Sequence, residues 1–246
     1  MAKIKLKYIL LFLFIVFLSG EITAGPPFNT DDPQPVDFKH WEYYIASINT
    51  FQSNTWTGTS PHFEVNYGLV PNVQVHLLLP MNYDFSTQKG FNFGYAYTEF
   101  GVKYRFVQET ENVPQIGTFP LVEIPTIQNS EFSNGKMQFF IPVWMQKSWG
   151  KLTSYGGTGY WINPGTGNKN WLFAGWQVQY DFTPAVTLGG ELYYHTANSV
   201  DAKSVAAFNI GGSINPSEKF HIIFSVGHSL INDSFTTTYL GLLWTI

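Results

Sequence analysis

The chain has no cysteine, few charged side chains and no long apolar run after its first 24 residues. The absence of cysteine excludes a disulfide scaffold and a zinc site built from thiolates. Charged residues make up 12% of the 246 positions, against roughly 25% in an ordinary soluble domain. The formal net charge is −4 and Arg105 is the single arginine, so a nucleic-acid partner is not expected.

The missing apolar run excludes a helical membrane protein, because a spanning helix needs about 20 consecutive apolar residues. Aromatic residues nevertheless reach 18%. Scarce charge together with abundant aromatic side chains is typical of a transmembrane β-barrel, which has an apolar outer face and a polar inner face. A soluble β-sandwich is the alternative fold for such a chain.

The first 24 residues have the three-part layout of a secretory signal peptide. Three lysines precede an apolar run at residues 8–18, and a short polar stretch leads to Ala24. Because the apolar run is too short to span a bilayer, we predict cleavage after Ala24 and Sec-type export. The predicted organisation is a signal peptide at 1–24, a proline- and aspartate-rich periplasmic lead-in or plug at 25–37, and the barrel at 38–246.

Apolar and polar residues alternate along the chain, most clearly at residues 93–107, and this is the pattern of a β-strand. Successive side chains of a strand point to opposite faces. One face of this segment carries Phe100, Val102, Tyr104 and Phe106, and the other carries Tyr97, Glu99, Gly101, Lys103 and Arg105. The charges all lie on one face, as expected for a strand between lipid and a polar lumen.

Similar segments recur, separated by clusters of Pro, Gly, Asn and Asp. Twelve are expected to be strands: 38–52, 60–70, 72–84, 93–107, 115–127, 136–148, 151–162, 169–182, 185–195, 203–215, 219–230 and 235–246. Most reach the about 9–11 residues that a tilted transmembrane strand needs. We therefore predict an all-β, up-and-down antiparallel barrel of about 12 strands, with both termini periplasmic because the strand number is even.

The expected connections alternate in length. Short turns are predicted at 70–72, 149–150, 183–184 and 216–218. The intervening loops, such as 163–168, are longer and polar. This alternation is typical of outer-membrane barrels, which have short periplasmic turns and longer outer loops. Residues 108–114 are the exception, because this connection is long where a short turn is expected.

The chain ends inside an expected strand. Its last residues place Leu240, Leu242, Trp244 and Ile246 on one face. This pattern is similar to the C-terminal signal that the barrel assembly machinery of the outer membrane recognises, although that signal usually ends in Phe. We therefore predict the assembly machinery and outer-membrane lipids as partners.

Outer-membrane barrels that hydrolyse lipids pair a histidine with a serine two positions along the same strand, so that the base reaches the nucleophile. The residues two positions after the six histidines of this chain are Glu42, Glu64, Leu78, Ala197, Ile223 and Leu230. None is serine, so we assign no catalytic residue. An enzyme would need a pair formed across strands.

Two histidine–glutamate pairs are candidate metal ligands. His40 with Glu42 and His62 with Glu64 share a strand face, so each pair offers two ligands. A hydrogen bond between histidine and glutamate in a polar lumen explains the same pattern. We therefore predict no metal site and no cofactor.

Alternation directs one set of polar and ionisable residues into the barrel: Glu42, Glu64, Glu99, Lys103, Arg105, Glu123, Glu191 and Tyr97. A lysine or arginine on the lipid face costs about 2–4 kcal/mol at mid-depth, so the charges are expected to face inward. They either form a network that stiffens and partly fills the barrel, or line a pore that selects solutes by charge and size; the two roles are compatible. Phe93 and Tyr95, which have the parity of Tyr97, could add a stacking surface.

The segment at residues 25–37 contains two adjacent aspartates among prolines. Proline keeps such a segment extended and outside the sheet. Asp31 and Asp32 would point apart in an extended chain, which argues against a shared proton or a shared ion. The segment could cover the periplasmic mouth or fold into the lumen as a plug. We predict the second arrangement, in which the aspartates would meet Lys103 and Arg105.

Four stretches resemble a bacterial family named for the MetA pathway of phenol degradation. They are residues 25–33 with 40–42, 61–72, 98–106 and 119–126. The resemblance implies an outer-membrane β-barrel of a Gram-negative bacterium and passage of small organic compounds, and it brings no catalytic residue with it.

We therefore predict an outer-membrane channel or transporter for passive passage of small solutes, hydrophobic or aromatic ones included, through a charged lumen. The alternatives are a closed structural or surface barrel with a plugged lumen, and a lipid-modifying outer-membrane enzyme.

Overall fold

The computed structural model describes residues 26–127 and 132–246, and the predicted signal peptide at 1–24 lies outside these ranges. Fourteen strand segments make up the described chain. They are β1 (Trp41–Gln52), β2 (Thr55–Val70), β3 (Val73–Ser86), β4 (Gly90–Tyr95), β5 (Tyr97–Val107), β6 (Gln115–Thr118), β7 (Leu121–Pro125), β8 (Gln138–Trp149), β9 (Leu152–Ile162), β10 (Trp171–Thr183), β11 (Val186–His195), β12 (Val205–Ser217), β13 (Phe220–Ser229) and β14 (Thr236–Thr245). Within the described ranges, no helix is long and apolar enough to cross a membrane.

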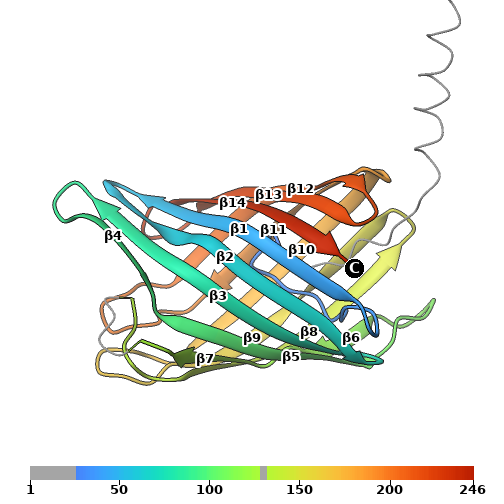
Figure 1. Ribbon diagram of the computed structural model, residues 1–246, viewed down its shortest axis with the longest axis horizontal. Helices are drawn as coiled ribbons and strands as arrows, with labels where there is room; N and C mark the ends of the chain where they lie inside the picture. The colour runs from blue at the N-terminus through green and yellow to red at the C-terminus, as the bar shows by residue number, and fades with distance from the viewer. Residues whose placement is uncertain (1–25, 128–131) are drawn as a thin grey trace, which may run out of the picture.

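All fourteen segments belong to one antiparallel sheet that closes into a barrel (Figure 1). β4 and β5 together occupy one position beside β3, and β6 and β7 together occupy the next, between β5 and β8. The barrel closes where β14 pairs with β1, from Thr236 opposite Phe51 to Thr245 opposite Glu42. The predicted all-β, up-and-down barrel of twelve strands is confirmed.

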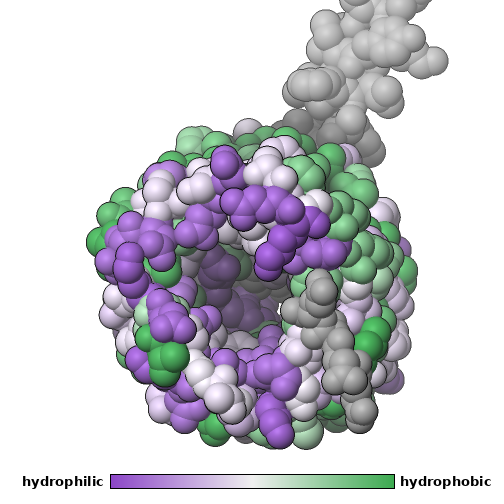
Figure 2. Space-filling view, turned by 90° about the vertical axis from the view of Figure 1, so that its left-hand side faces the viewer, coloured by the Kyte–Doolittle hydropathy of each residue, from purple (hydrophilic) through white to green (hydrophobic). Residues whose placement is uncertain are grey.

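The outer face of the barrel is apolar, because alternation along each strand sends apolar side chains outward. On β8, Ile141 and Val143 are 57% and 52% exposed, whereas Pro142 between them is buried and the next residue, Trp144, is 1% exposed inside the barrel. Figure 2 looks into one end and shows hydrophilic side chains around the mouth, with hydrophobic ones on the outer flank. The exposed apolar belt suits a lipid environment.

A β-bulge at Ala96 divides the strand that the sequence predicts as continuous at 93–107. Between the pairs Met81–Tyr95 and Leu78–Glu99, three residues of the β4–β5 side oppose two residues of β3. One extra residue reverses the facing of every side chain beyond it. Phe93 is therefore 52% exposed and stacks on Phe91, so the expected inward position of Phe93 is wrong.

A second interruption falls at residues 119 and 120, inside the segment predicted as one strand at 115–127. Pro120 has no backbone N–H and cannot donate to the ladder, and its carbonyl accepts a hydrogen bond from the N–H of Val102. Phe119 is buried, with its ring 5.3 Å from the ring of His76. The break therefore places an aromatic ring inside the barrel.

The connections divide the barrel into a turn end and a loop end. Two-residue turns join β2–β3, β8–β9, β10–β11 and β12–β13. At the other end the connections are longer, for example eight residues between β9 and β10 and nine residues between β11 and β12. The expected strands leave a long connection at residues 53–59 between the first two strands, and this expectation is wrong. Residues 55–59 continue the alternation and belong to β2, so a two-residue hairpin joins β1 to β2. β1 also begins at Trp41, three residues later than expected.

Candidate functional site in the barrel lumen

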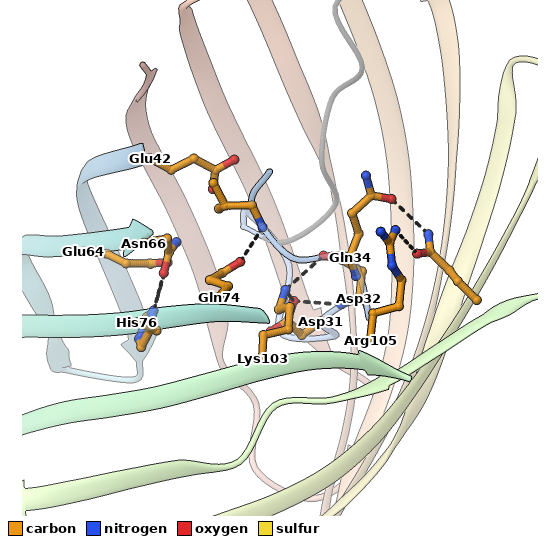
Figure 3. A network of polar contacts seen from close by, with 12 residues as sticks. Asp31, Asp32, Gln34, Glu42, Glu64, Asn66, Gln74, His76, Lys103 and Arg105 are labelled. Carbon is orange, nitrogen blue, oxygen red and sulfur yellow. Dashed lines mark hydrogen bonds and ion pairs between the residues drawn. The ribbon is translucent and has the colours of Figure 1, made fainter. Parts of the chain in front are cut away.

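Residues 26–37, here called the N-terminal segment, run through the interior of the barrel. Thr30 and Asp32 are completely buried, and Val36 is 6% exposed. Hydrogen bonds join the segment to β3, β5, β6, β11 and β13, so it is held from several sides of the wall. Figure 3 shows part of this network, in which Gln74 and Lys103 of the wall are directed toward the segment.

Glu191 on β11 anchors the start of the N-terminal segment. Its two carboxylate oxygens accept hydrogen bonds from the backbone N–H groups of Asn29 and Thr30, both at 2.8 Å. Asn209 on β12 donates a third hydrogen bond to this carboxylate at 2.6 Å. Glu191 is buried, and a hydrogen bond to a charged group contributes about 1.5–3 kcal/mol. This single side chain therefore contributes a large part of the attachment.

Lys103 on β5 anchors the middle of the segment. Its ammonium nitrogen lies 3.0 Å from Asp31 Oδ1 and 3.5 Å from Asp32 Oδ2. The same ammonium lies 5.0 Å from the ring centroid of Phe119. Lys103 and Asp32 are both buried, and removing one member of a buried ion pair costs about 3–5 kcal/mol because the other charge is left unpaired.

The two aspartates share one cation, so the expectation that they point apart is wrong. That expectation assumed an extended chain, whereas the backbone turns here. Asp31 accepts a hydrogen bond from the N–H of Asp32, and Asp32 accepts one from the N–H of Gln34, as short polar side chains do in turns. Burial raises the pKa of the Asp32 carboxyl, and the neighbouring Lys103 ammonium opposes this rise.

Arg105 does not reach the aspartates in the described part of the chain, contrary to the expectation from the sequence. Its guanidinium donates to Asn72 Oδ1 at 2.9 Å and to Gln115 Oε1 at 3.0 Å. Asn72 belongs to the β2–β3 turn, so Arg105 lies closer to the turn end than Lys103 does. It supports Gln115 instead of pairing with the segment's carboxylates.

Three uncharged side chains that sequence reasoning missed complete the attachment. Gln74 accepts a hydrogen bond from the N–H of Val36, Ser225 donates to the carbonyl of Pro27, and Gln115 donates to the side chain of Gln34, at 2.8, 2.7 and 3.1 Å. The signal for Gln74 was its inward parity, two residues before His76 on the same strand. Its partner on the N-terminal segment could not be read from that parity.

Two of the predicted inward residues, Glu64 and Glu99, lie beside His76 on β3. Its Nε2 lies 3.0 Å from Glu99 Oε1, and its Nδ1 lies 2.7 Å from Asn66 Oδ1 and 3.5 Å from Glu64 Oε1. Asn66 donates to Glu64, which leaves its oxygen facing the imidazole. Because both ring nitrogens face oxygen acceptors, the imidazole carries two N–H groups and a positive charge.

The remaining predicted residues lie in three places. Glu42 accepts a hydrogen bond from the hydroxyl of Tyr44 at 2.9 Å. Glu123 on β7 stands directly opposite Glu99 in the pairing of β5 with β7. Tyr97 donates to Asn134 in the loop that precedes β8. The predicted set is therefore spread along the barrel instead of forming one cluster.

Cavities lie on both sides of the N-terminal segment. Toward the loop end, a vestibule of about 660 Å³ is lined by Glu64, Glu99 and Phe173 among others; Figure 2 looks toward its mouth. Toward the turn end, a chamber of about 200 Å³ is lined by residues that include Trp41 and Leu243. Pro26, Pro27 and Phe28 line both cavities, so the segment forms the partition between them.

Gly175 on β10 is one of the points where the wall closely approaches the segment, because a Cβ there would overlap Thr30 Oγ1. Gly175→Ala is expected to displace the segment from the wall and to raise single-channel conductance in a planar bilayer. Gly94→Ala is the matched control, since its Cβ would meet Phe132 at an ordinary 3.4 Å. Equal conductance of the two variants would contradict the partition.

The hydrogen bonds of the histidines do not form a catalytic dyad with serine within the described ranges. His62 and His228 contact the hydroxyls of Thr59 and Thr236, both at 3.0 Å. No group of three or more histidine, aspartate or glutamate side chains in the described chain is arranged to hold a metal ion. The His62 and Glu64 pair considered from the sequence therefore lacks a third ligand there.

No family model and no curated protein matches the chain, so the resemblance to the phenol-degradation family is not confirmed. Solved barrels match well. An outer-membrane channel from Pseudomonas putida F1 aligns with a TM-score of 0.68 and 13% identity, over 92% of this chain and 100% of that chain. The NanC porin (TM-score 0.58, 10% identity) and the KdgM porin in complex with oligogalacturonate (0.55, 11%) each cover 82% of this chain, and 98% of the porin is covered. At these identities the likeness shows the fold, that of an outer-membrane β-barrel.

Proposed function

We propose that the protein is an outer-membrane channel for small solutes whose N-terminal segment closes the lumen. The observation that carries the proposal is the buried segment itself, which is anchored by Glu191 and Lys103 and has a cavity on either side. Residues 26–28 of this segment line both cavities, so the segment separates them. The lumen is closed while the N-terminal segment is in place, and release of the segment would open it.

The comparisons support a channel over an enzyme, because the aligned barrels are described as an outer-membrane channel and as porins. In this proposal the inward residues line the solute pathway, namely Glu42, Glu64, Glu99, Lys103, Arg105, Glu123, Glu191 and Tyr97. Asp31 and Asp32 belong to the plug. Hydrophobic and aromatic compounds are included among the solutes, because aromatic rings line part of the vestibule.

The proposal extends to the cellular setting. The apolar belt faces the lipids of a Gram-negative outer membrane, reached by Sec-type export after removal of residues 1–24. The turn end, with both termini of the mature chain, faces the periplasm. The final strand is the segment that the assembly machinery recognises, and the family named for phenol degradation is the proposed relative.

Purified protein in planar bilayers tests the channel. We expect conductance steps whose preference for cations over anions falls in Glu99→Gln, because this carboxylate lines the vestibule. Glu109→Gln is the matched control, since Glu109 pairs with Lys147 at 3.0 Å outside the two cavities. A barrel that migrates as folded protein on a gel but stays silent in the bilayer would favour the closed structural alternative instead.

A further inference from the structure

The vestibule has two chemically different walls. Its acidic wall is formed by β2, β3 and β5, which contribute His62, Glu64, His76 and Glu99. Glu123 on β7 lines an adjoining cavity of about 500 Å³, which shares His62 and Leu78 with the vestibule. Its aromatic wall is formed by β10 and β11, which contribute Trp171, Phe173 and Tyr193. β3 and β11 are six positions apart in a ring of twelve strands, so the two walls face each other across the lumen.

The acidic wall holds more negative charge than its own partners neutralise. Glu99 and Glu123 occupy directly opposed positions on neighbouring strands, an arrangement that is unfavourable for two like charges. Glu99 bonds to His76, whereas Glu123 has no hydrogen bond or ion pair to any other described residue. His76 also pairs with Glu64. The ammonium group of Lys103 already pairs with carboxylates of the N-terminal segment. A cation from outside the chain would therefore be favoured between these carboxylates.

Tyr239 provides a second and independent sign of an absent ligand. Its side chain lines the vestibule, the residue is only 8% exposed, and its hydroxyl has no hydrogen-bond partner among the described residues. A buried hydroxyl without a partner is unfavourable, because it has lost its bonds to water. A ligand with N–H or O–H groups, seated on the acidic side of the vestibule, would satisfy it.

The aromatic wall presents flat, ordered ring faces. Trp171 stacks on Trp161 with centroids 5.4 Å apart and an angle of 11° between the planes. Trp161 in turn stacks on Phe140 at 4.9 Å, and Phe173 stacks on Tyr193 at 6.1 Å. Rings held in this way offer stacking to an aromatic solute and cation–π attraction to an ammonium group.

We propose that the vestibule binds amphipathic organic cations, in which an ammonium group is carried on an aromatic body. The ammonium group lies between Glu99 and Glu123, where the vestibule meets the adjoining cavity. The Tyr239 hydroxyl lines the same vestibule as Glu99, and the aromatic body lies against Trp171 and Phe173. A cavity of about 660 Å³ falls within the roughly 300–1,000 Å³ of small-molecule sites. The inference rests on the proposed function, since the vestibule is the outer compartment of the channel.

Calorimetric titration of the purified protein in detergent tests the site with three probes of defined chemistry. Phenethylamine carries both the ammonium and the ring, ethylammonium lacks the ring, and benzenesulfonate reverses the charge. We expect phenethylamine to bind about tenfold or more tightly than either partial probe, because only it engages both walls. Equal binding of benzenesulfonate, or no binding of phenethylamine, would overturn the inference.

Substitutions assign the binding to the two walls. Glu123→Gln removes an unpaired carboxylate and Trp171→Leu removes a ring face, and each is expected to weaken phenethylamine about tenfold. Glu109→Gln, outside the vestibule, is expected to leave it unchanged. Unchanged affinity in both wall variants would place the cation elsewhere and overturn the site.

Conductance measured on the same preparations separates this inference from the proposed function. Binding in detergent needs no passage through the barrel. If the protein conducts but does not bind phenethylamine, the proposed channel function stands and the proposed cation site is refuted. If the protein binds phenethylamine through Glu123 but never conducts, the proposed cation site stands and the proposed channel function is refuted.

Discussion

Deletion of residues 26–34 is expected to raise the single-channel conductance of the reconstituted barrel severalfold. These residues contain the contacts to Glu191, Ser225 and Lys103, and Pro26 to Phe28 line the cavities on both sides. Without them the vestibule and the chamber join into one water-filled path. Strand pairing in the wall does not involve residues 26–34, because the named strands begin at Trp41, so the barrel itself is expected to assemble.

The control for this deletion is the folded state of the barrel. Heat-modifiable migration on a gel reports barrel closure independently of conductance, and the deleted protein is expected to keep it. A folded deletion variant that conducts no better than the intact chain would show that the N-terminal segment is not the obstruction. The charged side chains of the lumen wall would then close the barrel, as in the alternative of a closed structural barrel.

Glu191→Ala is expected to release the first part of the N-terminal segment. The substitution leaves the N–H groups of Asn29 and Thr30 without their acceptor and removes the partner of Asn209. Two charge-assisted bonds correspond to about 3–6 kcal/mol, of which water recovers part once the segment is free. We therefore expect the population of the released state to rise about 100-fold or more.

The absence of cysteine gives a direct measurement of this release. Thr30 is fully buried and its hydroxyl has no partner in the described chain, so Thr30→Cys introduces a thiol without breaking a hydrogen bond. We expect a water-soluble maleimide to modify this thiol slowly in the otherwise intact protein and about 100-fold faster with Glu191→Ala. Glu109→Ala is the matched loss of a carboxylate outside the lumen and is expected to leave the rate unchanged.

The Lys103 anchor determines how far the release extends. Asp31 and Asp32 remain paired with Lys103 in Glu191→Ala, so conductance is expected to rise less than in the deletion. Adding Lys103→Met removes the second anchor, and the two substitutions together are expected to reproduce the deletion. An unchanged labelling rate at position 30 in Glu191→Ala would contradict the role of this carboxylate.

The barrel could be predicted from the sequence because strand alternation is a local property. Each residue's facing follows from its parity, and the apolar and polar sets separate cleanly, as Phe100 and Lys103 show. The two interruptions could not be predicted in the same way. A bulge at Ala96 adds one residue without changing composition, and it reversed the facing assigned to Phe93.

The partners of the inward residues could not be predicted, because the contacts join distant parts of the chain. Glu191 was expected inward, yet the backbone it holds is 162 residues away at Asn29. Lys103 was expected to meet Asp31 and Asp32, and their ammonium–carboxylate distances are 3.0 and 3.5 Å. The same expectation for Arg105 was wrong, because its depth along the barrel brings it to Asn72 instead.

The sequence by itself determined the twelve-stranded barrel, its apolar belt and the facing of strand residues away from the bulge at Ala96, because a period of two specifies the facing of each residue in an uninterrupted strand. Only the tertiary structure decided which inward residues meet. Closure of the barrel sets the depth and the angular position of each strand, and these placed Glu191 and Lys103 around the N-terminal segment. They also placed the acidic strands opposite the aromatic ones, which no single stretch of the chain could reveal.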